Sequence, residues 1–117
     1  MPFEISNSKV GSIILLNLKG TIVAGNDKQK LVDTMQESLE AGETNFILDL
    51  GEVSFADSTG IGGLIAASAM ATRKGGSVKL LHLTKRIHDV LQITRLSTVF
   101  GIFDDLQKAI DSFEIFD

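Results

Sequence analysis

Three neighbouring polar side chains, Asp57, Ser58 and Thr59, carry the groups best placed to do chemistry in this sequence, and the glycine-rich segment Gly60–Gly63 follows them. Hydroxyls of this kind act as nucleophiles when a base lies beside them. All three residues are also good helix N-caps, whereas each glycine inside a helix costs roughly 1 kcal/mol relative to alanine. A helix start needs only one cap, so the segment departs from local structural preference, which often marks a functional site. The alternative is that Asp57 or Ser58 merely caps the helix, and the two interpretations are compatible.

A serine nucleophile would need a base, and His82 and His88 are the only histidines. His82 is expected in a strand and His88 on a short helix, each in packing or at the surface. A Ser58–His82 pair is geometrically allowed, but no third group that would orient the histidine is apparent. The turn at Asp57–Gly60 also differs from that of aspartic proteases, because a helix is expected to follow it. We therefore assign no catalytic residues and do not expect an enzyme.

The glycine-rich segment also invites comparison with nucleotide-binding loops. Gly60–Gly63 follows a strand and opens a helix, but it matches neither the dinucleotide fingerprint nor a P-loop, and no lysine follows it to meet phosphates. Weak nucleotide contact stays open as an alternative. The chain has no cysteine, which excludes disulfides and thiolate zinc sites. No cofactor and no metal site are expected.

The composition indicates one globular domain over residues 1–117, with 44% apolar residues available for a core. The net charge is −4, from 11 basic and 15 acidic side chains, and the basic residues occur in scattered pairs. Tyrosine and tryptophan are absent, so bases would find no obvious stacking platform. Direct nucleic-acid binding is therefore not expected.

The hydropathy of the chain bears on its location. No stretch approaches the roughly 20 apolar residues that a membrane-spanning helix needs, so no membrane insertion is expected. The first residues, Met1-Pro2-Phe3-Glu4, do not resemble a signal peptide. We expect a cytoplasmic location, and the sequence gives no indication of the oligomeric state.

The apolar pattern predicts strands that alternate with helices. The first two strands are expected to form a hairpin with a turn near Ser8–Gly11, and Gly20 is expected to end the second strand. Asn26 with Gln29 has the spacing of a capping box, and Gly42 is placed to stop the helix that it begins. Thr84 is expected to cap a short helix, and Asp104 and Asp105 to begin the last one. The predicted strands cover residues 3–6, 12–18, 45–50, 77–83 and 99–103.

This order predicts an α/β fold with a mixed four- to five-stranded sheet flanked by about four helices. In open sheets of this class, ligands and partners gather beyond the carboxyl ends of the strands. The segments Gly20–Asp27, Gly51–Gly62 and Leu83–Arg86 are expected there. The helix after Ser58 is rich in glycine and alanine, which predicts a smooth outer side that a partner could approach closely; the alternative is that alanine is only a good helix former.

The residues now support a resemblance. The strings Ile47-Leu48-Asp49-Leu50 and Val53-Ser54-Phe55-Ala56-Asp57-Ser58-Thr59-Gly60-Ile61-Gly62 resemble the core motif of STAS domains, particularly anti-anti-sigma factors. The similarity extends to Gly75-Gly76, to Leu83-Thr84-Lys85-Arg86, and through Leu91, Leu96 and Phe100. It spans nearly the whole chain, and it implies a single STAS-like domain.

The resemblance implies that Ser58 is phosphorylated by an anti-sigma serine kinase. The unphosphorylated form would bind this kinase and release a sigma factor, and a metal-dependent serine phosphatase would reset the switch. Asp57 would orient the Ser58 hydroxyl or help the kinase to recognise it, Thr59 is a second possible acceptor, and Gly60 would belong to the same contact. Lys85 and Arg86 would meet the partner or the phosphate, unless they form only the solvated first turn of a helix.

One segment departs from the family pattern. Family members often carry acidic residues soon after the glycine that ends the second strand, whereas this chain has Thr21-Ile22-Val23-Ala24-Gly25-Asn26-Asp27. The loop, with Thr21 and Asn26, is still expected to contact the partner, so the departure concerns which partner binds. Similar modules also serve as accessory subunits of lipid-transport ATPases or as scaffold parts of stress-sensing complexes, which are the alternative functions.

Overall fold

The computed structural model describes residues 2–93 and 100–113 and begins with an antiparallel hairpin. Strand β1 (Glu4–Val10) pairs with strand β2 (Ile13–Ile22), from Glu4 opposite Lys19 to Val10 opposite Ile13. The turn lies at residues 11–12, where Gly11 has a φ of 61° that favours glycine. The hairpin was predicted, and Gly11 belongs to its turn as expected, whereas Ser8 and Lys9, predicted near the turn, still pair within β1.

Strand β2 does not end at Gly20, as the sequence had suggested, but continues to Ile22. Its pairing with the next strand shifts register between Gly20 and Thr21, and Gly20 has a φ of 104°. A Cβ atom at Gly20 would overlap the carbonyl oxygen of Pro2. The glycine therefore marks an irregularity inside the strand, where the backbone needs a left-handed conformation and close approach.

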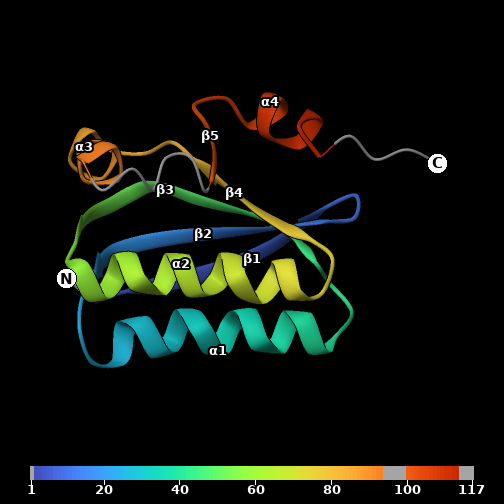
Figure 1. Ribbon diagram of the computed structural model, residues 1–117, viewed down its shortest axis with the longest axis horizontal. Helices are drawn as coiled ribbons and strands as arrows, with labels where there is room; N and C mark the ends of the chain where they lie inside the picture. Colours follow the sequence, from blue (N-terminus) through green and yellow to red (C-terminus); the bar gives the residue numbers. More distant parts are fainter. Residues whose placement is uncertain (1, 94–99, 114–117) are drawn as a thin grey trace.

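Strands β3, β4 and β5 then follow in chain order, each parallel to the strand before it, which gives a five-stranded sheet in the order β1-β2-β3-β4-β5 (Figure 1). With the four helices of residues 2–93 and 100–113, this is the mixed α/β sheet that the sequence predicted. The elements after β2 are α1 (Asn26–Glu40), β3 (Asn45–Ala56), α2 (Ser58–Arg73), β4 (Ser77–Leu81), α3 (Lys85–Ile93), β5 (Gly101–Phe103) and α4 (Leu106–Asp111).

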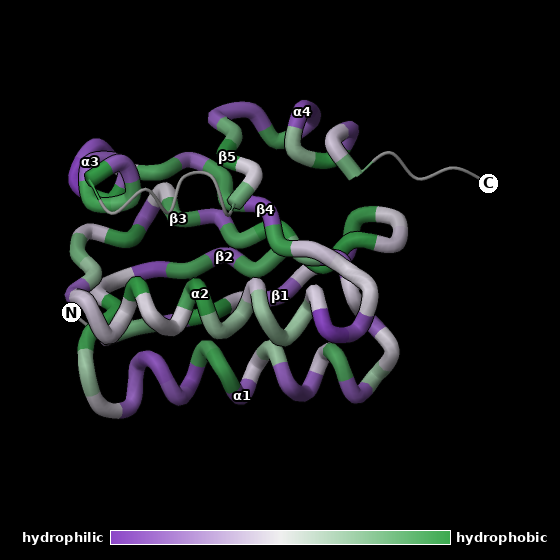
Figure 2. The backbone as a smooth tube through the Cα atoms, in the orientation of Figure 1, coloured by the Kyte–Doolittle hydropathy of each residue, from purple (hydrophilic) through white to green (hydrophobic). Residues whose placement is uncertain are grey.

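The larger apolar core lies between the sheet and helices α1 and α2, which run side by side (Figure 1). Helix α1 contributes Leu31, Met35 and Leu39, which recur at helical spacing and are buried. Figure 2 shows many hydrophobic residues along the strands of the sheet. Along α1, hydrophilic residues alternate with hydrophobic ones. Helix α3 adds Ile87 and Leu91 to the same core.

A smaller cluster lies on the other face of the sheet, under α4. It joins Ile13, Ile47 and Leu81 to Ala109, with Leu106, Ile110 and Phe113 packed around them. Asp105 caps α4 by accepting a hydrogen bond from the Lys108 amide at 3.0 Å, close to the predicted helix start. The start predicted for the last strand, Val99, and the matched residue Leu96 lie outside the described residues.

Helices α1 and α3 begin differently from one another. The Thr84 hydroxyl accepts a 3.4 Å hydrogen bond from the Ile87 amide, which confirms the predicted cap of α3. The capping box at Asn26 was wrong: Gly25, with a φ of 97°, stands at the N-cap of α1, and no side chain caps that helix. Strand β3 also runs six residues beyond the predicted end at Leu50, to Ala56, because Val53 and Ala56 still face the core.

Candidate functional site

The candidate site lies at the carboxyl ends of β2 and β3, where α2 begins. Strand β3 ends at Ala56 and α2 begins at Ser58, so Asp57 alone connects them. The segment Gly51–Gly62, which was expected beyond the carboxyl end of a strand, therefore consists mostly of strand and helix. A one-residue connection leaves the chain little freedom, and this fixes the start of α2 relative to the sheet.

Asp57 ties the start of α2 to the loop that follows β2. Its Oδ1 accepts a hydrogen bond from the Gly60 amide at 2.8 Å, and its Oδ2 accepts one from the Ala24 amide at 3.1 Å. The Asp57 amide in turn donates to the Ile22 carbonyl at 3.2 Å. The N-cap role considered from the sequence thus belongs to Asp57, and it leaves Ser58 without a capping role.

The Asp57 carboxylate accepts two hydrogen bonds from backbone amides, and this leads to a stability prediction. Replacing an N-cap aspartate by alanine costs about 0.5–2 kcal/mol of stability. We expect Asp57→Ala to lower the free energy of unfolding by about 2 kcal/mol, because two backbone amides lose their acceptor. Asp105→Ala removes a cap with a single bond, to the Lys108 amide, and should cost about 1 kcal/mol. Urea unfolding of both variants tests this, and equal losses would contradict the bridging role of Asp57.

Ser58 is the first residue of α2, and its side chain is exposed. Thr59 follows, half-buried, and Gly60 is buried. A Cβ atom at Gly60 would overlap the carbonyl oxygen of Ile22, so only glycine fits against β2 at this point. The site thus presents one exposed hydroxyl, that of Ser58, on a backbone fixed from both sides by Asp57 and Gly60.

The predicted loop residues lie at the same end of the sheet. Thr21 lies within β2, opposite Phe55 of β3, and is half-buried. Asn26 is the exposed first residue of α1. Its neighbour Asp27 orders the loop, because the Asp27 Oδ2 accepts a hydrogen bond from the Val23 amide at 3.1 Å. The loop is therefore ordered by a carboxylate that the sequence reasoning had not singled out.

Lys85 and Arg86 are the first two residues of α3, and their side chains contact different partners. Lys85 pairs with Asp89 on its own helix at 3.0 Å, as solvated helix residues do. The Arg86 guanidinium instead lies over the Phe55 ring, 5.6 Å from its centroid. Phe55 is 38% exposed, which is unusual for a phenylalanine on a central strand. The sequence analysis did not predict the contact between Phe55 and Arg86. Its only sign in the sequence is that Phe55 stands three residues before Ser58.

Only part of the small-residue side of α2 faces outward. Gly63, Ala67 and Ala71 are buried, whereas Ile65 and Ala69 are exposed. The prediction of a smooth outer side therefore needs correction, because half of the small residues let α2 pack closely on its own neighbours. The outer surface instead carries an apolar side chain, Ile65, with 37% exposure.

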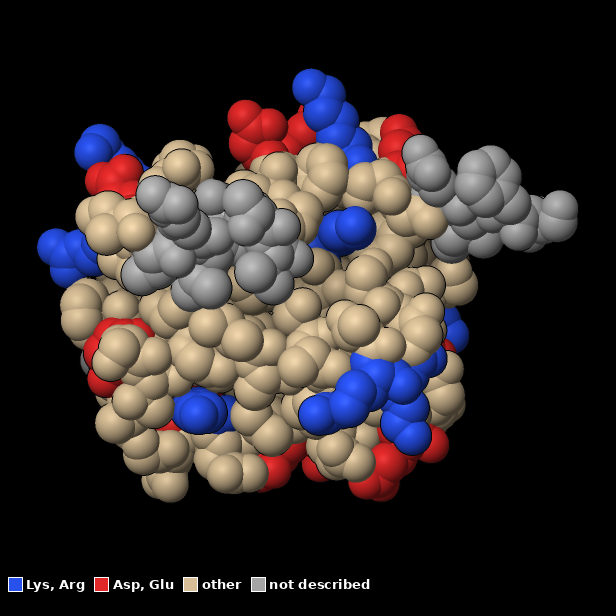
Figure 3. Space-filling model, viewed as in Figure 1, with Lys and Arg blue, Asp and Glu red and all other residues tan. Residues whose placement is uncertain are grey.

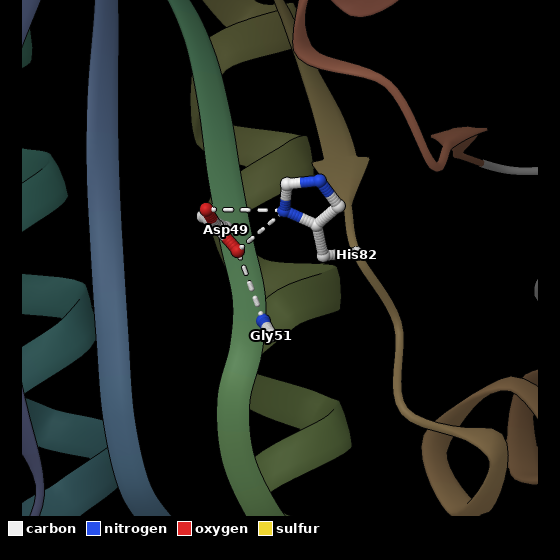
Figure 4. A network of polar contacts seen from close by, with 3 residues as sticks. All are labelled: Asp49, Gly51 and His82. Carbon is white, nitrogen blue, oxygen red and sulfur yellow. Dashed lines mark hydrogen bonds and ion pairs between the residues drawn. The ribbon is translucent and has the colours of Figure 1, made fainter.

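His82 contacts Asp49 on the face of the sheet that lies away from α1 and α2 (Figure 4). Its Nδ1 lies 3.2 Å from Oδ1 and 3.3 Å from Oδ2 of Asp49, and the Gly51 amide donates to the same Oδ1 at 2.9 Å. His82 follows the end of β4 and has a φ of 57°, so the expectation that it lies in a strand was wrong. The orienting carboxylate that the sequence did not reveal is Asp49, and His82 contacts it rather than Ser58.

The described part of the chain offers neither a metal site nor a membrane-spanning helix. Residues 2–93 and 100–113 contain no group of three or more potential metal-ligating side chains. None of the described helices is long and apolar enough to cross a membrane. The face in Figure 3 carries its basic side chains in separate small groups.

Comparison with known proteins places this architecture in a family. Residues 4–109 match the STAS domain family. The chain belongs to the STAS domain family. One STAS relative, the anti-sigma-B factor antagonist of Bacillus subtilis, is 38% identical over 53 residues, which are 45% of this chain and 49% of that protein.

Two solved structures illustrate how widely this STAS fold is used. The anti-sigma factor antagonist SpoIIAA in its unphosphorylated form has a TM-score of 0.72 at 18% identity, covering 98% of this chain and all of that chain (100%). A sulfate transporter family protein from Wolinella succinogenes has a TM-score of 0.70 at 19% identity, covering 90% of this chain and 87% of that one. At such identities the likeness concerns the fold alone.

Proposed function

We propose that this STAS domain is an anti-sigma factor antagonist controlled by phosphorylation at Ser58. The unphosphorylated form binds an anti-sigma serine kinase and so frees a sigma factor, and the phosphorylated form does not bind. A metal-dependent serine phosphatase removes the phosphate and resets the switch. The observation that carries the proposal is the exposed Ser58 hydroxyl at the first position of α2, on a backbone held by Asp57 and Gly60.

The surroundings of Ser58 support a role as substrate rather than as catalyst. The Ser58 hydroxyl makes no hydrogen bond within the described residues, and His82 is engaged with Asp49. A nucleophilic serine needs a base within hydrogen-bond reach. Among fold relatives, SpoIIAA has been solved in both an unphosphorylated and a phosphorylated form. A protein of this fold therefore exists in both states.

The geometry also allows the domain to keep its fold when phosphorylated. A phosphoserine adds about −1.5 to −2 charges, which is favourable near the positive end of a helix dipole. Asp57 would oppose this charge, but both of its carboxylate oxygens already accept hydrogen bonds from backbone amides. We therefore expect the phosphate to act on partner binding rather than on the fold.

The docking surface for the kinase is proposed to surround Ser58. It includes Thr59 beside Ser58, Asn26 at the start of α1, and Arg86 on Phe55. Exposed aromatic and arginine side chains are typical anchors of protein interfaces, which favours the Phe55–Arg86 pair over the solvated Lys85. Gly60 and Thr21 are partly or fully buried, so they shape this surface through the backbone.

An accessory role in a transporter or a scaffold is the second candidate, since a sulfate transporter family protein shares the fold. Such a role needs only a binding surface and gives no purpose to an exposed serine at the start of α2. The exposed Ser58 therefore favours the phosphorylation switch.

The proposed kinase acts inside the cell, so the proposal includes a cytoplasmic location for this protein.

Transfer of phosphate from ATP tests the proposal directly. The protein is incubated with a candidate anti-sigma kinase and labelled ATP, and the modified residue is mapped by mass spectrometry. We expect stoichiometric labelling of the wild type and of Thr59→Ala, and none of Ser58→Ala. Equal labelling of the wild type and Ser58→Ala would refute the assignment of Ser58. Labelling that Thr59→Ala alone abolishes would move the site to Thr59.

A further inference from the structure

Lys28 of helix α1 packs on the glycine pair of helix α2. A Cβ atom placed on Gly63 would lie 3.2 Å from Cγ of Lys28, and one placed on Gly62 would lie 3.9 Å from its Nζ. The aliphatic part of Lys28 therefore lies along Gly63, and its ammonium group lies over Gly62. Larger side chains at these two glycines would fill the space that Lys28 occupies.

This arrangement brings the ammonium group close to Ser58. Gly62 follows Ser58 by four residues on α2, so both lie on the same side of the helix, with Cβ positions about 5–6 Å apart. Helices α1 and α2 run side by side and begin at the same end of the sheet (Figure 1), so Lys28 and Ser58 both belong to a first turn. The Lys28 ammonium thus lies over the residue one helical turn beyond Ser58, on the same side of α2.

The charge of Lys28 is not balanced within the described residues. Lys9, Lys19 and Lys85 each have a carboxylate within 4.0 Å, whereas no ion pair or hydrogen bond involves the Lys28 ammonium in residues 2–93 and 100–113. Lys28 is also half-buried, so the position of its side chain is restricted by packing. A restricted, unpaired cation one turn from an exposed serine is suited to receive an anion attached to that serine.

We propose that Lys28 is the counter-charge within this chain for a phosphate on Ser58, an inference that rests on the proposed phosphorylation of that residue. In the unphosphorylated protein the Lys28 ammonium is available to an acidic group of the kinase. In the phosphorylated protein it pairs with the phosphate. Phosphorylation therefore changes the docking surface twice, because it adds negative charge at Ser58 and neutralises positive charge at Lys28.

The test measures the phosphate itself and needs no kinase. Phosphoserine is introduced at position 58 during synthesis by genetic code expansion, and its second ionisation, with a pKa near 6 in free phosphoserine, is followed by phosphorus NMR at low salt. Lys28→Met removes the ammonium but keeps the unbranched apolar chain that packs on Gly63. We expect the phosphate pKa to rise by roughly half a unit in Lys28→Met, because a nearby cation favours the dianion.

Three further variants make the result specific. Lys28→Gln should reproduce the rise, which guards against misfolding of the methionine variant, and Lys28→Arg should keep the low pKa. Lys108→Met removes an exposed lysine from α4 on the other face of the sheet and should leave the phosphate pKa unchanged. An unchanged pKa in both Lys28→Met and Lys28→Gln, or an equal rise in Lys108→Met or Lys28→Arg, would overturn the proposal.

The result is separable from that of the labelling experiment. If no kinase labels Ser58 but the pKa difference is found, the proposed function fails while the contact between Lys28 and a phosphate at this position stands. If Ser58 is labelled but the pKa is the same in all variants, the switch stands and Lys28 has no part in it.

Discussion

Phosphorylation of Ser58 is expected to weaken binding of the anti-sigma kinase by at least about 100-fold, which corresponds to about 3 kcal/mol. The physical reason is the place of the phosphate: Ser58 is exposed at the start of α2, within the proposed docking surface. A charge buried at an interface without a partner commonly costs several kcal/mol. Isothermal titration calorimetry, with phosphoserine introduced at position 58, measures the difference in Kd.

Two variants serve as controls for this binding experiment. Ser58→Ala removes the hydroxyl without adding charge and should bind within about threefold of the wild type. Thr59→Glu adds charge at the half-buried neighbour and separates a general electrostatic effect from one specific to position 58. Wild-type affinity of the phosphorylated protein would contradict the switch, and equal losses for phosphoserine 58 and Thr59→Glu would argue against its specificity.

Gly60→Ala is expected to lower the free energy of unfolding by about 2–4 kcal/mol, although alanine is the better helix former. The added methyl group would overlap the Ile22 carbonyl oxygen, which also accepts the 3.2 Å hydrogen bond from the Asp57 amide. Relief of the overlap must move α2 away from β2 and so weaken this hydrogen bond. Thermal unfolding should show a fall in Tm of more than about 8 °C.

Gly62→Ala is the matched control, two residues further along the same helix. Its added Cβ would meet only the Lys28 ammonium, at an ordinary contact distance of 3.9 Å. We therefore expect Gly62→Ala to be neutral or to stabilise the domain by up to about 1 kcal/mol, through the higher helix propensity of alanine. Similar losses of stability in the two variants would show that the close approach of Gly60 to β2 is not the cause.

Much of the fold could be predicted from local patterns, and the failures have physical causes. The buried side of α1 follows the helical spacing of Leu31, Met35 and Leu39, a pattern that is visible in the sequence itself. Strand β3 was predicted too short because Gly51 and Glu52 look like a loop, although Val53 and Ala56 return to the core. Strand β3 continues through these polar residues because β2 continues to pair with it, as far as Ile22 opposite Ala56. Such pairing cannot be read from the local pattern of one strand.

The candidate site divides in the same way. Asp57 and Ser58 became candidates because consecutive capping residues before glycines form an unusual local pattern. The packing of Arg86 on Phe55 and of Lys28 on Gly62 was missed, because each joins two elements that are distant in the chain. Such contacts leave no periodic signal in a single sequence, so they became visible only when α1, α2 and α3 were placed around the sheet.

The order of the strands in the sheet, which is also their order in the chain, has a consequence for biosynthesis. Each strand that leaves the ribosome can pair with the strand made just before it, at the open edge of the growing sheet. The backbone contacts of the site join Ile22, Ala24, Asp57 and Gly60, and all of these precede β4. A nascent chain that has emerged as far as Arg73 therefore already holds the hydrogen-bond partners that join Asp57 to β2, to the loop after it and to the start of α2.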